Sequence, residues 1–308
     1  MIDIIIPAYN AHESIKKTLA SVAIQTIIKK CNVFIVNDGS TIDYSEEINF
    51  FNNYMNISEL KIMNNKGIGY ARNFGLKNSR GEFLMFIDAD DVLNDCFSIE
   101  NLYNNIKYDY DYVVSYVLVE KEEKKFTLEK FFNGNLHGKI YKRKFIEENE
   151  ISFNDVRMHE DNMFNSIIFL CNPKINCVHE VTYIYKNNAN SLTKTCNNYF
   201  ETYISSMELV MKKMEKANNK KYNNFIFSTI LYLYYSYLDI EDNKENFIKW
   251  CNKLYKYYDK YCNNNCDKNE IIKERTIEIL NTNKVIDKFL LPNITFENFL
   301  ELIKNKNR

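Results

Sequence analysis

Short apolar segments alternate with amphipathic ones in the first part of the chain, and this alternation limits the possible fold more than any other feature. The apolar segments are Ile2–Ile6, Val33–Val36, Leu60–Met63 and Phe83–Ile87, and the amphipathic ones between them are Glu13–Ala23, Tyr44–Tyr54 and Tyr70–Leu76. Strands that alternate with helices form a mainly parallel sheet with helices on both faces. Such sheets bind ligands beyond the carboxyl ends of their strands. We therefore expect an α/β domain with its site at that edge.

The pattern changes further along the chain. Residues 112–186 mix strand-like runs, Tyr112–Val119 and Val181–Tyr185, with a helix over Asp161–Leu170. From Tyr199 onwards the pattern is helical: Tyr199–Lys216, Asn223–Leu238, Lys244–Tyr261, Lys268–Leu280 and Thr295–Lys304. We predict a catalytic domain over residues 1–195, with a nucleotide half (1–95) and an acceptor half (96–195), followed by a helical domain over 196–308.

Composition excludes some functions. The 308 residues carry 40 Lys+Arg against 41 Asp+Glu, and this balance argues against nucleic acid as the main partner. The amino terminus does not resemble a signal peptide, and the apolar run Phe225–Leu238 is shorter than the ~20 residues of a membrane helix. The eight cysteines show no Cys-x-x-Cys pair, which indicates free thiols. We expect a cytoplasmic protein, and peripheral contact with the inner face of the membrane stays open.

Two acidic loops follow predicted strands. Asp88-Ala89-Asp90, with Asp91 beside it, comes directly after Phe83–Ile87. These carboxylates could bind Mg²⁺ or Mn²⁺, or form a polar turn whose aspartate caps the next helix. Asp38, in Asn-Asp-Gly-Ser, follows another strand and suits a turn as well as a contact to a nucleotide.

Three other polar segments carry candidate residues. A loop with Gly67 and Gly69 leads into a helix that holds Arg72, which suits a phosphate site, but the third glycine of a dinucleotide fingerprint is missing. Glu160 and Asp161 stand where a helix begins, so they either complement its dipole or supply a general base. His137-Gly138-Lys139 and the Lys186–Lys194 segment are interpreted, each alone, as surface features.

Taken together, these segments resemble the family 2 glycosyltransferases of the GT-A fold. The motifs are IIIPAYN, VNDGST, NKGIGYARNFG, GEFLMFIDADD and HEDNMF, in the order of that family over residues 1 to about 195. The resemblance implies a nucleotide site made by Pro7, Ala8, Tyr9, Glu13, Asp38, Lys66, Arg72, Asp88, Ala89, Lys186 and Ser191. It implies Mn²⁺ or Mg²⁺ held by Asp90, with Asp88 and, as a third ligand, His179. Asp161 corresponds to the catalytic base, and Glu160 supports it or orients the acceptor.

The implied activity is transfer of a hexose or N-acetylhexosamine, with inversion, from a nucleotide sugar that we expect to be a UDP-sugar. The acceptor would be a hydroxyl of a glycan, a lipid-linked glycan or a protein. The helical region could cap the catalytic domain, form a homodimer or contact the acceptor. Two alternatives stay open: a nucleotidyltransferase on a similar sheet, and a non-catalytic relative that binds nucleotide or glycan.

Overall fold

The structure is a computed structural model, and it describes residues 1–41, 43–122, 125–129, 134–154, 158–188, 198–217, 219–239, 243–262, 266–268, 271–272 and 295–305. The chain divides into two compact units, Met1–Cys196 and Asn197–Arg308. Each unit is described by itself below. The boundary that we predicted between residues 195 and 196 falls outside the described residues.

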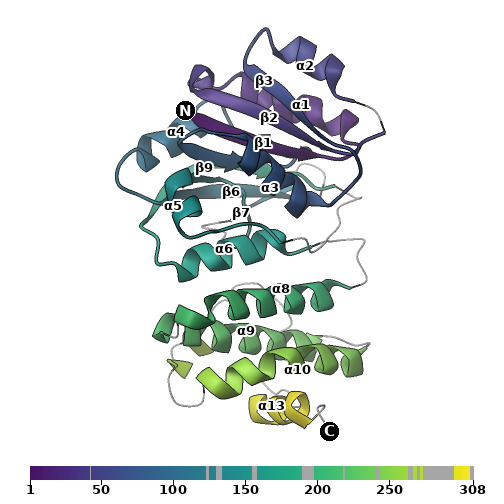
Figure 1. The fold of residues 1–308 in the computed structure, drawn as a ribbon, viewed down its shortest axis with the longest axis vertical. Helices are drawn as coiled ribbons and strands as arrows, with labels where there is room; N and C mark the ends of the chain where they lie inside the picture. The colour runs from purple at the N-terminus through teal and green to yellow at the C-terminus, as the bar shows by residue number, and fades with distance from the viewer. Residues whose placement is uncertain are drawn as a thin grey trace. The chain divides into compact units, whose positions relative to one another are not determined.

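One mixed sheet forms the centre of the first unit (Figure 1). Its strands are β1 (Ile2–Ala8), β2 (Cys31–Asp38), β3 (Asn56–Ile62), β4 (Phe83–Phe86), β5 (Val92–Leu93), β6 (Tyr112–Glu122), β7 (Lys125–Glu129), β8 (Lys139–Lys142) and β9 (Ile175–Tyr185). They lie in the order β3-β2-β1-β4-β8-β6-β9-β5, and β7 pairs with β6. Within the group β1 to β4, each strand runs parallel to the strands beside it. The parallel sheet that we expected is therefore confirmed.

Helices cover both faces of β1, which explains why all seven of its residues are buried. Alternate residues of a strand face opposite sides. Ile2, Ile4 and Ile6 belong to the core cluster that includes α1 (His12–Ala23), α2 (Ser45–Phe51) and α4 (Ser98–Ile106). Ile5 faces α3 (Ile68–Asn78), where a Cβ on Gly75 would lie 2.5 Å from the Ile5 side chain. Glycine at position 75 therefore allows α3 to pack closely on the sheet.

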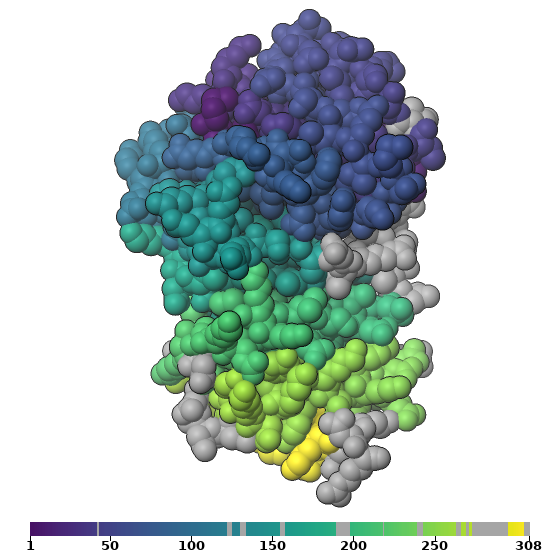
Figure 2. Space-filling view, viewed as in Figure 1, coloured from purple at the N-terminus to yellow at the C-terminus, as the bar shows by residue number. Residues whose placement is uncertain are grey.

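The later part of this unit extends the sheet beyond β4 through β8, β6 and β9. Strand β8 pairs antiparallel with β4, through Phe83 with Lys142 and Leu84 with Tyr141. The beginning of β8 consequently lies at the edge of the sheet where β4 ends. Helices α5 (Arg143–Glu148) and α6 (Glu160–Leu170) follow, and Figure 2 shows blue atoms of the first part of the chain packed directly against teal atoms of this later part.

A buried ionic cluster joins the two parts at the other edge of the sheet. Asp3, on β1, is 0% exposed and accepts hydrogen bonds from Asn32 Nδ2 and the backbone amides of Arg80 and Gly81. Its carboxylate also forms an ion pair of 3.1 Å with Arg143 Nη2, on α5. The cluster therefore fixes α5 to the first strand.

We expect Asp3→Asn to lower the free energy of unfolding by about 1.5–3 kcal/mol, because it removes a charged, buried acceptor from Arg143 and two amides. Urea denaturation would measure this loss. The matched control is Asp109→Asn, since Asp109 is 82% exposed and an exposed ion pair such as that with Lys174 contributes little to stability. Equal effects of the two substitutions would contradict the role assigned to Asp3.

The second unit is helical, as expected. Its described helices are α8 (Tyr199–Met214), the short 3-10 helix η2 (Glu215–Ala217), α9 (Lys220–Asp239), α10 (Lys244–Tyr261) and α13 (Phe296–Asn305). Aromatic and aliphatic side chains such as Phe227, Leu254 and Phe299 form its core. The predicted helix Lys268–Leu280 lies mostly outside the described residues. None of the helices that the structure describes is long and apolar enough to cross a membrane.

Candidate active site

Three neighbouring parallel strands end at one edge of the sheet and bring the predicted loops together. Pro7 and Ala8 end β1 and are buried, whereas the next residue, Tyr9, is 53% exposed. Asp38 ends β2, and the loop beginning at Asp88 follows β4. This edge therefore presents an exposed aromatic ring and several carboxylates from loops that are far apart in the sequence.

Asp38 holds the glycine-bearing loop in place. Its two carboxylate oxygens accept hydrogen bonds of 2.8 Å from the backbone amides of Lys66 and Gly67. The chain turns sharply at Gly39, where φ is +73° and a Cβ would lie 2.6 Å from the amide nitrogen of Asn65. Both the backbone conformation and the close approach require glycine at this position.

The acidic loop after β4 is fixed by buried hydrogen bonds. Thr18 Oγ1, on α1, donates to the carbonyl oxygens of Ala89 (3.0 Å) and Asp91 (2.7 Å). Asp91 is 0% exposed and accepts hydrogen bonds from Tyr183 OH (2.7 Å) and from the backbone amide of Lys186 (2.8 Å). Burial raises the pKa of the Asp91 carboxyl to about 7. The segment after β9 is thus tied to this loop.

Arg72 connects the acidic loop to the beginning of α6. Its Nη2 lies 2.6 Å from Asp88 Oδ1 and its Nη1 lies 2.5 Å from Glu160 Oε1. Burial opposes ionisation of Asp88, but the Arg72 guanidinium and His137 outweigh it and lower the pKa of that carboxyl. Burial and the neighbouring Asp161 raise the pKa of Glu160 to about 7 in spite of Arg72.

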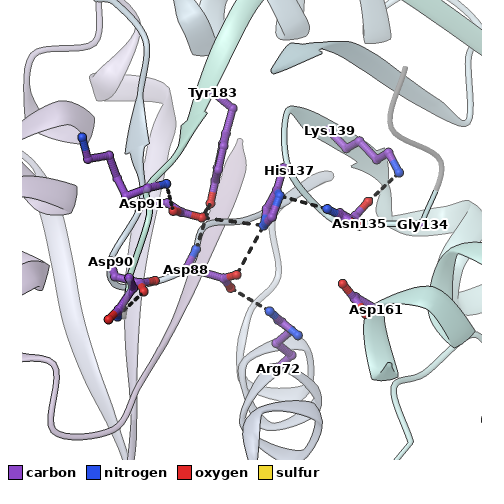
Figure 3. Close-up of polar contacts among 12 residues, drawn as sticks. Arg72, Asp88, Asp90, Asp91, Gly134, Asn135, His137, Lys139, Asp161 and Tyr183 are labelled. Carbon is purple, nitrogen blue, oxygen red and sulfur yellow. Dashed lines mark hydrogen bonds and ion pairs between the residues drawn. The ribbon is translucent and has the colours of Figure 1, made fainter. Parts of the chain in front are cut away.

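His137 faces the same carboxylates, as Figure 3 shows. Its ring stacks on Tyr183, and its Nε2 lies 3.4 Å from Asp88 Oδ2 and 3.6 Å from Asp91 Oδ2. Although burial lowers the pKa of His137, the hydrogen bond to Asp88 and the charge of Asp91 raise it overall. Ligand atoms of Asp88, Asp91 and His137 all lie within 4.8 Å of one another, so these side chains could hold a metal ion.

The interpretation of His137 and Lys139 as surface residues is wrong. His137 is 8% exposed and Lys139 is 1% exposed. Polar residues around a glycine are typical of a surface turn, but here the segment leads into β8, whose antiparallel pairing places its beginning beside the end of β4. No local signal in the sequence marks this burial, because it depends on the pairing of the short strand β8 with β4.

Asp161 lies in the first turn of α6 and is half-buried. Its Oδ1 accepts a hydrogen bond of 2.7 Å from the backbone amide of Asn162. In Figure 3 its carboxylate points towards the side on which Arg72, Asn135 and His137 lie. Glu160, in contrast, is 6% exposed and paired with Arg72. The two adjacent carboxylates therefore differ in access: Asp161 is half-buried, whereas Glu160 is enclosed.

Other predicted residues lie outside the cluster of Asp88, Asp91 and His137. Glu13 and Lys66 have exposed side chains. Lys186 Nζ lies 3.0 Å from the Glu120 carboxylate, and His179 is exposed with its Nδ1 2.8 Å from Tyr116 OH. Asp90 Oδ2 accepts a hydrogen bond of 2.8 Å from Asn188 Nδ2. Ser191 lies outside the described residues.

Lys139 makes the stability of the fold depend on pH. Burial lowers the pKa of Lys139 from 10.5 to about 7, against the attraction of Asp161. Between these values the unfolded chain binds more protons, so the free energy of unfolding should rise with pH, by up to about 1.4 kcal/mol per pH unit. We expect Lys139→Met to flatten this rise above neutrality in urea denaturations, whereas Lys144→Met, at a residue 73% exposed, should leave it unchanged. Equal slopes in the two variants would contradict the depressed pKa.

The chain is similar to proteins of a known family. The family model described as "Glycosyl transferase family 2" matches residues 3–160. Poly(ribitol-phosphate) beta-N-acetylglucosaminyltransferase TarP of Staphylococcus aureus (strain N315) is 26% identical over 299 residues, which cover 84% of this chain and 91% of TarP. Glycosyltransferase GlyA of Streptococcus pneumoniae serotype 4 is 30% identical over 223 residues, 63% of this chain, but the match spans only 31% of GlyA.

Solved structures share the fold. The structure of S. aureus TarS 1-349 in complex with UDP has a TM-score of 0.69 and 17% identity, over 99% of this chain and 91% of that one. Mannosyltransferase PcManGT from Pyrobaculum calidifontis, in complex with GDP-Man and Mn²⁺, has a TM-score of 0.54 and 15% identity, over 70% of this chain and 64% of that one. The expected fold, a GT-A sheet flanked by helices and followed by a helical region, is confirmed.

Proposed function

This chain belongs to glycosyl transferase family 2, and we propose that it transfers a hexose or N-acetylhexosamine, with inversion, from a UDP-sugar to a hydroxyl group of a glycan, lipid-linked or protein acceptor. The observation that carries the proposal is the position of Asp161. Its half-buried carboxylate lies near Arg72 and His137, beside the edge where β1, β2 and β4 end. A carboxylate that could act as a base thus lies beside the loops proposed to hold the donor.

The nucleotide would bind at the ends of β1 and β2. Tyr9 offers an exposed ring for the base, with Pro7 and Ala8 behind it. Both oxygens of Asp38 already accept a backbone amide, but a carboxylate oxygen can accept more than one hydrogen bond, so Asp38 can still accept one from a base imide. Glu13, Lys66, Lys186 and Ser191 remain proposed contacts to the ribose or the diphosphate.

We assign the proton transfer to Asp161. As the acceptor oxygen forms its bond to the anomeric carbon, its proton passes to the Asp161 carboxylate, and the bond from that carbon to the diphosphate oxygen breaks. Attack from the side opposite the leaving diphosphate inverts the configuration of the carbon. Glu160 is 6% exposed and its carboxylate is held by Arg72, so it is not accessible to the acceptor hydroxyl. Its proposed role is to hold Arg72 and the beginning of α6.

The acidic loop fits a divalent cation. Carboxylate oxygens and an imidazole nitrogen are suitable ligands for Mn²⁺, and Asp88, Asp91 and His137 offer such atoms close together. Asp90, in the same acidic loop, is the ligand that the family motif implies. Its side chain accepts a hydrogen bond from Asn188. A bound cation would stabilise the negative charge that develops on the departing diphosphate. Of the two candidate histidines, we propose His137, since it faces Asp88.

The test is turnover of a panel of nucleotide sugars with Mn²⁺, with and without EDTA. We place UDP-GlcNAc first because TarS has been solved with it, and poly(ribitol phosphate) first among acceptors because TarP carries it in its name. Metal-dependent turnover of one donor would support the proposal. Absence both of turnover and of metal-dependent nucleotide binding would refute it.

Two histidine variants test the metal assignment. We expect His137→Ala to raise the Mn²⁺ concentration for half-maximal turnover by at least about tenfold, because it removes a ligand facing Asp88 and Asp91. His179→Ala is the matched control, because His179 is exposed and bonded to Tyr116. A shift with His179→Ala and none with His137→Ala would reverse the assignment.

A further inference from the structure

A buried amide lies between the segment that carries His137 and the beginning of α6. Asn165, on α6, is 5% exposed. Its Nδ2 lies 3.1 Å from the carbonyl oxygen of Gly134, 3.0 Å from that of Asn135 and 3.0 Å from that of Asp161. One side chain thus donates hydrogen bonds both to the loop before β8 and to the backbone of the proposed base.

Lys139 strengthens the same connection. Its Nζ donates hydrogen bonds to the carbonyl oxygen of Asn135 (2.5 Å) and to Asn165 Oδ1 (3.3 Å). The amine can donate these bonds whether or not it is charged. We call Lys139 and Asn165 the brace. Figure 3 shows Lys139 extending towards Asn135 on the side of the loop away from Asp88.

The loop that the brace holds also orients His137. Asn135 Nδ2 lies 3.3 Å from His137 Nδ1, while His137 Nε2 faces Asp88 and Asp91. Fixing the backbone at Asn135 therefore limits where the imidazole can lie. Because the same amide contacts the Asp161 carbonyl, the brace joins the His137 loop to the first turn of α6.

Packing alone is a poor reason for these residues. A buried amine or amide costs free energy unless its hydrogen bonds are satisfied, and an apolar side chain of similar volume is often as stable. The bonds of the brace go to carbonyls of Gly134, Asn135 and Asp161, which belong to the two segments that carry His137 and Asp161. The pattern is that of outer residues that orient a site's ligands.

We propose that Lys139 and Asn165 are positioning residues that hold His137 and Asp161 at a fixed separation across the site, so that cation binding and proton transfer occur in one geometry. This inference rests on the proposed function. Neither residue would touch the donor or the acceptor. Their loss should therefore weaken Mn²⁺ binding and slow turnover, while the nucleotide pocket at β1 and β2 stays intact.

The experiment compares wild type with Lys139→Met and Asn165→Ala in the full-length chain. UDP binding by calorimetry counts the intact sites, Mn²⁺ affinity in the presence of UDP is measured by electron paramagnetic resonance, and kcat for donor turnover is expressed per UDP-binding site. We expect UDP to bind each variant with wild-type stoichiometry. Mn²⁺ should bind at least about tenfold more weakly, and kcat per site should fall by about 10-fold to 100-fold.

The matched control is Tyr141→Phe. Tyr141 OH donates a hydrogen bond of 2.9 Å to the same atom, Asn165 Oδ1, but donates none to the loop or to Asp161. Removal of this hydroxyl should therefore lower the melting temperature and leave Mn²⁺ affinity and kcat per site unchanged. Wild-type Mn²⁺ affinity and kcat in both brace variants would overturn the proposal. Loss of UDP binding in both would also overturn it, because the pair would then serve folding. Absence in wild type of both turnover and metal-dependent nucleotide binding would instead refute the proposed function.

Discussion

Asp161→Asn is expected to lower kcat for sugar transfer by about 10²-fold to 10⁴-fold, the range that a positioned general base contributes. The amide keeps the size of the side chain and its hydrogen bond from the Asn162 amide, but it cannot accept the acceptor's proton. Since Asp161 lies across the site from the strand ends proposed to hold the nucleotide, the dissociation constant for UDP should not change. Steady-state kinetics and calorimetry on the same preparation would separate the two effects.

Two variants serve as comparisons for Asp161→Asn. Asp109→Asn makes the same chemical change at an exposed carboxylate and should leave kcat unchanged. Glu160→Gln should reduce kcat less than Asp161→Asn does, because Glu160 is buried and held by Arg72, so its carboxylate is not accessible to the acceptor hydroxyl. If Glu160→Gln lowered kcat more than Asp161→Asn does, while UDP bound as in wild type, Glu160 would be the base instead.

Arg72→Met is expected to lower the free energy of unfolding by about 3–5 kcal/mol, the cost of breaking a buried ion pair by removing one partner. Arg72 is 2% exposed and bridges Asp88 and Glu160, so its removal leaves a buried carboxylate without its cation. Turnover should fall as well, because the acidic loop loses its connection to α6. Urea denaturation gives the first quantity and kcat per UDP-binding site the second.

The bridging geometry can be tested further. Arg72→Lys should recover little, because an ammonium group lacks the planar fork that reaches both carboxylates. The double variant Arg72→Met, Glu160→Gln should lose less stability than the sum of the two single losses. In it the Glu160 carboxylate, which Arg72→Met alone leaves without its cation, is replaced by a neutral amide. Arg80→Met, at an exposed arginine just after α3, is the control. A loss no greater than that of Arg80→Met would contradict the role of Arg72.

The first four strands and the helices between them were predictable because their signals are local. Phe83–Ile87 is apolar without interruption, and Ile2–Ile6 is interrupted only by Asp3, as expected for strands covered on both faces. Their carboxyl ends had to meet at one edge, which placed Asp38 and Asp88 together before any contact was known. The beginning of one strand was predicted too late. Strand β3 begins at Asn56, before the apolar segment Leu60–Met63 from which it was predicted, because its exposed positions carry polar residues.

The strands beyond β4 were harder to predict. Strand β9 begins at Ile175, although only Val181–Tyr185 resembled a strand, since the first half is mostly exposed and contains His179 and Glu180. Strand β8 has only four residues, too few for a clear periodic pattern. Which earlier strand it would join, and in which direction, depends on packing between distant parts of the chain.

The sequence by itself thus determined the parallel sheet, the loops at its carboxyl edge and the carboxylates that those loops carry, because hydrophobic periodicity acts over a few residues. Only the tertiary structure decided which basic side chains lie beside these carboxylates. The antiparallel pairing of β8 with β4 brings His137 to Asp88, and packing of α3 near α6 lets Arg72 bridge Asp88 and Glu160. These partners are 16 to 88 residues apart in the sequence, and their proximity follows from burial and strand pairing across the whole unit.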